Sequence, residues 1–149
     1  GVEVGKGRHY EEAFYGLVLV HAVLFDKVAK SLDALALTPA KMNVLMIIKH
    51  QGGEKGLSQM EIGKRLIVTA SNMTRLLDKL EREKLIERVG RDGDKRIKVA
   101  RISKRGAQIL DNAWPEYMKT MKEIMNKLSG AEQKILAEMM IKWFRDLKD

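Results

Sequence analysis

The sequence predicts a mainly α-helical fold that carries one small β-hairpin. Apolar residues recur at helical spacing over most of the 149 residues. Residues 85–102 are different, because charged and β-branched residues alternate there around Asp92-Gly93, a dipeptide typical of a two-residue hairpin turn. The central order of helix, turn, helix and charged hairpin is that of a winged helix-turn-helix.

The hairpin is strongly basic. We expect a type I′ turn at Asp92-Gly93, in which both central residues take a positive φ. Acidic residues near the turn are outnumbered by Lys and Arg; the basic residues are Arg88, Arg91, Lys95, Arg96, Lys98 and Arg101. Such a hairpin is either a solvated surface element or one that meets an anion, and the helix before it favours the anion.

That helix is predicted within residues 69–82. Met73, Leu76, Leu77 and Leu80 follow helical spacing and form one apolar stripe, with Thr69 as the expected N-cap. The opposite face carries Ser71, Asn72, Thr74, Arg75, Asp78 and Lys79. The first turn has no carboxylate, which leaves the positive end of the helix dipole open to phosphate oxygens and base edges.

A shorter helix is predicted just upstream. Ser58 and Glu61 have the spacing of a capping box, and Ile62 and Leu66 would form the buried side. Gly63 is expected to permit close approach of a neighbouring helix.

Long amphipathic helices are predicted at both ends of the chain. One spans about 9–35, and Thr38-Pro39 then starts a mostly apolar, buried helix. Ser103 starts another, expected to bend near Trp114-Pro115, and a capping box at Ser129 opens the last. The central region is too small to cover all three outer helices, so they predict a surface for a partner; an intrachain cap on a monomer is the alternative.

From about Thr38 to Gly106 the sequence resembles the multiple-antibiotic-resistance repressor (MarR) family of transcriptional regulators. The resemblance rests on Leu57-Ser58-Gln59, the pattern 71–80, Leu85-Ile86-Glu87-Arg88 and Asp94-Lys95-Arg96. The last of these fits an Asp-x-Arg motif of the family, followed by a helix start at Ser103-Lys104-Arg105-Gly106. Ser103 stands where Thr is more usual, and both residues cap helices well.

The resemblance implies one domain over residues 1–149 with two functional regions. Residues 9–36 and 104–148 would form a helical dimerisation region, and residues 38–103 a DNA-binding lobe. The expected function is a homodimeric regulator, a repressor on a pseudo-palindromic operator in double-stranded DNA. Family members often release DNA when a small aromatic or anionic effector binds; the candidate contacts here are Phe14, His21, Met46, His50, Trp114 and Tyr117.

The residue types assign roles within the DNA-binding lobe. Ser71, Asn72, Thr74 and Arg75, with Lys79 on the same face, would read the major groove or fix the register, and Arg75 is the expected purine reader. Arg96, assisted by Arg91, Lys95 and Lys98, would reach the minor groove and phosphates. Asp94 would orient the hairpin by pairing with a neighbouring arginine.

Composition agrees with nucleic acid as the partner. The net charge is +8, and residues 69–105 hold twelve Lys/Arg against six Asp/Glu, which gives +6 of that total. The absence of Cys excludes disulfides and thiolate metal sites, and no stretch has the length of a membrane span, so a cytoplasmic protein is expected. His9, His21 and His50 lack the spacing of metal ligands, and neither a metal nor a cofactor is expected.

Two other functions fit some of these features. A nonspecific DNA-coating chromosomal protein would share the charge and the winged-helix fold, but would not distinguish an operator from random duplex. An enzyme would need a catalytic motif, and the sequence contains no GxSxG, HExxH or GxxxxGK. We therefore expect no enzymatic activity.

Overall fold

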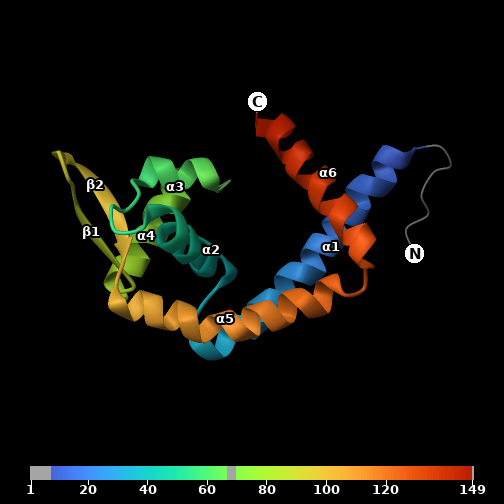
Figure 1. The fold of residues 1–149 in the computed structure, drawn as a ribbon, viewed down its shortest axis with the longest axis horizontal. Coiled ribbons are helices and arrows are strands. Elements are labelled where there is room, and N and C mark those ends of the chain that lie inside the picture. Colours follow the sequence, from blue (N-terminus) through green and yellow to red (C-terminus); the bar gives the residue numbers. More distant parts are fainter. Residues whose placement is uncertain (1–7, 67–69, 149) are drawn as a thin grey trace.

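The computed structural model describes residues 8–66 and 70–148 as six α-helices and one two-stranded sheet (Figure 1). The predicted N-cap Thr69 lies outside the described residues. The elements are α1 (His9–Leu32), α2 (Pro39–Ile47), α3 (Gln59–Arg65), α4 (Ala70–Arg82), β1 (Ile86–Arg91), β2 (Asp94–Ile102), α5 (Lys104–Met125) and α6 (Gly130–Lys148). A 3-10 turn follows α1, and a π-helical turn, Ile48–Gly52, follows α2.

The predicted capping signals define several helix starts. Thr38 caps α2 with Pro39 at its first position, and Ser58 and Glu61 form the expected capping box of α3. Ser129 and Glu132 form the same box at α6, with Ser129 N donating to Glu132 Oε1 at 2.9 Å and Glu132 N to Ser129 Oγ at 3.2 Å. Each box satisfies main-chain donors that the first helical turn leaves unpaired.

Figure 1 shows two unequal parts joined by α5. Helices α2, α3 and α4 and the hairpin form a lobe at one end of α5, while α1 packs along α5 and lies beside α6 at the other end. Helix α5 continues through Pro115 as one curved helix, where the sequence predicts a bend. The core is centred on the lobe and is closed by Leu32 of α1 and Leu110 of α5; its lobe residues include Met42, Leu45, Ile48, Ile62, Met73, Leu77 and Leu80.

One buried charge is held inside this lobe. The side chain of Lys41 is 7% exposed, and its Nζ donates to both carboxylate oxygens of Glu83 at 2.8 and 3.0 Å. The ion pair joins α2 to the chain that follows α4. Because an ammonium group removed from water is costly without a partner, Glu83 makes the burial of Lys41 tolerable.

Hydrogen bonds join the start of α5 to the residues that directly follow α4. Lys84 has φ +61°, its N–H bonds Glu81 O, and Leu85 N bonds Leu80 O, the two bonds of a Schellman motif. Ser103 Oγ then donates to Lys84 O at 2.7 Å, and Ser103 N donates to Leu85 O at 3.1 Å. The carbonyls of the two residues that complete the Schellman motif are thus satisfied by the cap residue of α5.

Glycine makes this contact possible. A Cβ built on Gly106 would lie 2.0 Å from Leu85 O, far inside any real contact. At Gly63, by contrast, an added Cβ would meet nothing within 4 Å, so the expected close approach there is wrong. Among the helical glycines Gly63 and Gly106, the one that permits close packing is Gly106, at the start of α5.

The turn differs in type from the prediction. Gly93 has φ +89°, but Asp92 does not have a positive φ, so the turn lacks the pair of positive angles that defines type I′. The turn matters for function because it leads directly into the irregular part of β2 that carries Lys95 and Arg96.

We expect Gly106→Ala to destabilise the protein by about 1–3 kcal/mol, because the new methyl group must push α5 away from Leu85. Gly63→Ala is the matched control and is expected to stabilise by about 0.5–1 kcal/mol, since alanine favours the helix and meets open space. Urea unfolding at one fixed protein concentration measures both. Equal effects of the two substitutions would contradict the proposed packing at Gly106.

Candidate nucleic-acid interface

The base of the hairpin is fixed to the lobe by main-chain bonds. Leu57 N donates to Ala100 O at 3.0 Å, and Ala100 N donates to Leu57 O at 2.7 Å. Ile86, Val99 and Ala100 are buried at this end of the sheet. The hairpin therefore projects from an anchored base.

Its outer half is irregular. The ladder pairs Gly90 with Lys98 and then Arg91 with Asp94, so residues 95–97 form a bulge on β2. A Cβ on Gly90 would lie 2.9 Å from Lys95 Cδ and 3.0 Å from Lys95 O, so glycine makes room for the bulge. The bulge places Lys95 and Arg96 at the exposed tip.

Asp94 pairs with Arg96, as the sequence predicts. Arg96 Nε donates to Asp94 Oδ1 at 3.0 Å, Nη2 donates to Oδ2 at 3.2 Å, and the Arg96 main-chain N–H donates to Oδ1 at 3.1 Å. The Arg96 side chain lowers the pKa of Asp94, and Asp94 in turn raises the pKa of Arg96. With its side chain 91% exposed, Arg96 is oriented by Asp94 yet open to an incoming anion.

Helix α4 presents a polar face beside the hairpin. Met73, Leu77 and Leu80 are buried and Leu76 is half-buried, so the predicted apolar stripe is confirmed. The first turn contains no acidic residue. The predicted major-groove set Ser71, Asn72, Thr74, Arg75 and Lys79 is exposed.

A side-chain bond joins the two helices of the motif. Gln59 Nε2 donates to Thr74 Oγ1 at 2.7 Å, so the first turn of α3 contacts α4 on its polar face. Thr74 is thus held in place by α3 before any nucleic acid binds.

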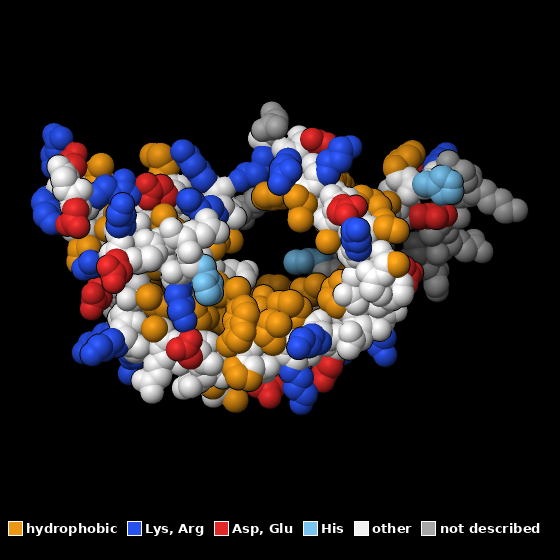
Figure 2. Space-filling view, in the orientation of Figure 1, with side chains coloured by type: hydrophobic (Ala, Val, Ile, Leu, Met, Phe, Trp, Pro, Cys, Tyr) orange, Lys and Arg blue, Asp and Glu red, His pale blue; other side chains and the backbone are white. Residues whose placement is uncertain are grey.

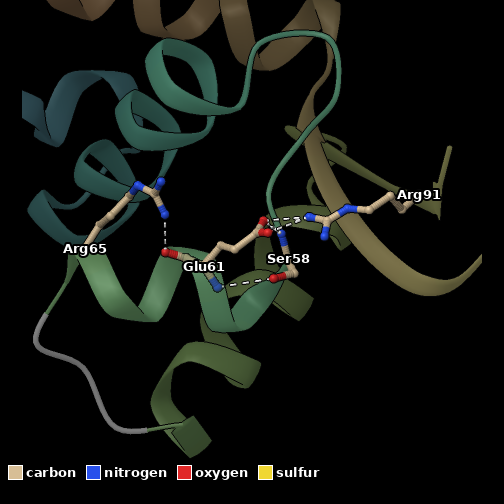
Figure 3. Close-up of polar contacts among 4 residues, drawn as sticks. All are labelled: Ser58, Glu61, Arg65 and Arg91. Atoms are coloured by element: carbon tan, nitrogen blue, oxygen red, sulfur yellow. Dashed lines mark hydrogen bonds and ion pairs between the residues drawn. The ribbon is translucent and has the colours of Figure 1, made fainter. Parts of the chain in front are cut away.

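Arg91 is placed differently from the other basic residues of the hairpin. Its Nη2 lies 2.7 Å from both Oε1 and Oε2 of Glu61, in the first turn of α3 (Figure 3). The Arg91 side chain, followed by the Ser58 main-chain N–H, lowers the pKa of Glu61. Arg91 therefore faces α3. On the sequence alone it is grouped instead with the residues expected to reach DNA.

A second arginine of β1 contacts α4. Arg88 Nη2 lies 2.8 Å from Asp78 Oδ1, although the two atoms are not aligned for a hydrogen bond. The sequence showed the charges of Arg88 and Glu61 but not these contacts. No spacing signal reveals them, because each joins residues ten or more positions apart in sequence.

The candidate effector contacts fall into separate places. His50, Trp114 and Tyr117 lie together, with ring centroids 6.5 Å apart for the first pair and 5.8 Å for the second, and burial raises the pKa of Tyr117. Met46 packs against the core. Phe14 and His21 lie on α1, beside Tyr15 and Phe25 respectively. The six residues do not form one pocket within a single chain.

Figure 2 shows Lys and Arg side chains at the hairpin end and also on the opposite part of the molecule, while hydrophobic side chains line the hollow between the two parts. Within the described residues, no group of three or more His, Asp or Glu could hold a metal ion. No single described helix is long and apolar enough to cross a membrane; the segments 9–35 and 39–52 reach that length and composition only as a pair bent by 80°.

Comparisons with known proteins agree with this geometry. Residues 37–97 match the MarR family. A Bacillus anthracis protein described as an uncharacterized HTH-type transcriptional regulator is 33% identical over 107 residues, which cover 71% of this chain and 69% of that protein. The HTH-type transcriptional regulator MhqR of Bacillus subtilis (strain 168) is 26% identical, with 77% of each chain covered.

Solved structures share the fold at lower identity. AbsC, a MarR family regulator from Streptomyces coelicolor, superposes with a TM-score of 0.87 at 14% identity, with 99% of each chain covered. A mutant of MarR from E. coli, in complex with operator DNA, superposes with a TM-score of 0.81 at 21% identity, covering 93% of this chain and 98% of that one. The chain belongs to the MarR family of winged-helix, DNA-binding transcriptional regulators.

Proposed function

We propose that this protein is a sequence-specific repressor that acts in the cytoplasm as a homodimer on a pseudo-palindromic operator. The observation that carries the proposal is the pairing of two different DNA-facing elements: a helix whose first turn lacks acids, and a basic tip whose Arg96 is exposed and oriented by Asp94. Helix α4 would enter the major groove, where Arg75 reads a purine. The hairpin would reach the adjacent minor groove and phosphates through Arg96, with Lys95 and Lys98.

The outer helices support a second copy of the chain as the partner. Large hydrophobic side chains are exposed along α1 and α6, including Phe14, Phe25, Met139, Trp143 and Leu147. A groove of about 810 Å³ runs between α1, the end of α5 and α6. An apolar surface of this extent favours association over exposure to water. A dimer would also present two α4 helices, as a two-fold operator requires.

An effector site is proposed where the aromatic residues meet. His50, Trp114 and Tyr117 form a ring cluster between the DNA-binding lobe and α5, and Met46 packs against the core of the lobe. A small aromatic molecule would stack against these rings, and an anionic group on it would accept a hydrogen bond from His50. Phe14 and His21 would take part only if a second chain brings them near.

Binding should depend steeply on salt. If a dimer neutralises on the order of six to ten phosphates, log affinity falls against log salt with a slope of about −0.9 per phosphate. A fragment recovered from the source genome should bind roughly a thousandfold more tightly than random duplex in the same buffer. Fluorescence anisotropy titrations of both duplexes over a range of salt give the two numbers. A slope near zero would contradict nucleic-acid binding, and equal affinities would favour the DNA-coating protein.

The two DNA-facing elements should differ in what they recognise. Arg75→Ala should cost roughly 1–3 kcal/mol at particular base pairs and relax specificity there, because a bidentate contact to guanine is lost. Arg96→Ala should weaken binding while base preference in the major groove stays, because an arginine in the minor groove senses groove width and potential. Titrations against single-base operator variants separate these outcomes, with Arg145→Ala on α6 as the control for loss of one charge. Uniform weakening by Arg75→Ala would make Arg75 a phosphate contact.

The proposed dimer can be tested with two matched substitutions. Met139→Glu, on the exposed face of α6, should weaken dimerisation at least about a hundredfold, because an unpaired carboxylate would be buried in the interface. Met60→Glu, on α3, removes an even more exposed methionine away from that face and should leave the dimer intact. Sedimentation equilibrium measures both dissociation constants. A dimer that survives Met139→Glu would place the interface elsewhere.

A further inference from the structure

Strand β1 is joined to both helices of the helix-turn-helix by arginine ion pairs. Arg88 reaches Asp78 on α4, and Arg91, the last residue of β1, reaches Glu61 on α3. A two-stranded sheet is only marginally stable without support, so contacts near the tip matter for where the tip lies. The base is already fixed by Leu57 and Ala100, which leaves Arg91 as the contact next to the turn.

Glu61 serves two purposes at once (Figure 3). Its Oε2 accepts from Ser58 N at 2.8 Å and closes the capping box of α3, while both oxygens accept from Arg91 Nη2 at 2.7 Å. Arg65, on the next turn of α3, bonds the main-chain carbonyl of Glu61. The Ser58 N–H therefore holds the carboxylate from the α3 side, and Arg91 bonds the carboxylate in that position.

The position of Arg91 affects Arg96 through the pairing of strands β1 and β2. Arg91 pairs with Asp94 across the strands, and Asp94 holds the guanidinium and the main-chain N–H of Arg96. A continuous set of contacts therefore runs from the cap of α3 to Arg96.

We propose that Glu61 and Arg91 form a positioning pair that sets where the hairpin tip lies relative to α4, so that Arg96 and the recognition helix engage one duplex together. This inference rests on the proposed DNA-binding function. It assigns Arg91 to positioning, whereas the sequence suggested a direct contact with DNA.

The geometry favours positioning over direct contact. The Arg91 side chain is 32% exposed and both of its short bonds go to one carboxylate, whereas the Arg96 side chain is 91% exposed. To bind a phosphate, Arg91 would have to give up Glu61, and the freed carboxylate would then stand near the negatively charged backbone. Binding that breaks the pair is thus opposed by electrostatics.

The two roles predict opposite effects of one substitution. If Arg91 binds DNA directly, Glu61 competes with the phosphate, and Glu61→Gln should strengthen DNA binding. If the pair positions the tip, Glu61→Gln should weaken binding, even though it removes a negative charge from the interface. Glutamine can still accept from Ser58 N, so the capping box is kept and only the charged pair is lost.

The experiment is a double-mutant cycle on the full chain with Glu61→Gln, Arg91→Gln and the double variant. We expect each single change to weaken binding to the genome-derived fragment about fivefold, the scale of a partly exposed charged pair. The double variant should be no weaker than either single one, and Arg91→Lys should recover part of the loss. Hydroxyl-radical footprints should lose protection where the hairpin binds and keep it where α4 binds.

Two substitutions serve as matched controls. Glu132→Gln changes the equivalent acid of the α6 capping box, which lies far from the hairpin, and should leave DNA binding unchanged. Asp92→Asn removes an acid at the turn whose side chain is 99% exposed, and should keep or raise the affinity. Together they separate loss of a capping acid and loss of a negative charge from loss of the Arg91 contact.

A measurement without DNA separates this inference from the proposed function. Hydrogen exchange of main-chain amides in residues 88–98 should accelerate in Glu61→Gln and Arg91→Gln, while exchange in α4 stays the same. Unchanged exchange, stronger binding by Glu61→Gln, or additive losses in the cycle would each overturn the positioning role. Failure of the wild-type protein to bind DNA in a salt-dependent way would instead overturn the proposed function, whatever the exchange data show.

Discussion

The main chain around Leu85 is the constraint on which the arrangement depends, because three parts of the molecule meet there. Helix α4 ends at this point with the Schellman bonds of Lys84 and Leu85, the hairpin begins at Ile86, and α5 starts against the Leu85 carbonyl. The contact leaves no room for a side chain at position 106. Because α5 leads to the outer helices, the orientation of α4 is tied to that part of the molecule through a few main-chain bonds.

The hairpin is a short sheet supported by polar contacts. Its base is bonded to the chain before α3, and its outer part is held by arginines that pair with Asp78 and Glu61. These pairs are partly exposed, so each adds little to the free energy of folding. Their importance lies in geometry, because they fix a flexible element in one orientation next to the recognition helix.

Charge and apolar surface are divided between the two parts of the molecule. Residues 69–105, which include α4 and the hairpin, carry +6 of the net charge of +8. Most of the exposed large hydrophobic side chains lie on α1 and α6. This separation matches two different kinds of partner, a polyanion at one end and a nonpolar protein surface at the other.

The sequence alone determined what depends on neighbours along the chain. Capping boxes at Ser58 and Ser129, the apolar stripe of α4 and the Asp94–Arg96 pair all involve residues two to seven positions apart, and helical or turn geometry dictates their contacts. The order of these local patterns predicted the winged helix-turn-helix fold class, and the resemblance to the MarR family then gave the expected roles. The contacting residues in these segments are close enough along the chain for local helix or turn geometry to determine their contacts.

The tertiary structure decided the contacts between distant segments. It paired Arg91 with Glu61, gave the role of close packing to Gly106 instead of Gly63, and separated Phe14 and His21 from the aromatic cluster at Trp114. Within the turn it gave a positive φ to Gly93 and not to Asp92, and it placed a bulge on β2 directly after the turn. Such features depend on how whole elements pack in space. The position of a charged residue or a glycine in the sequence does not show which distant atom it will contact.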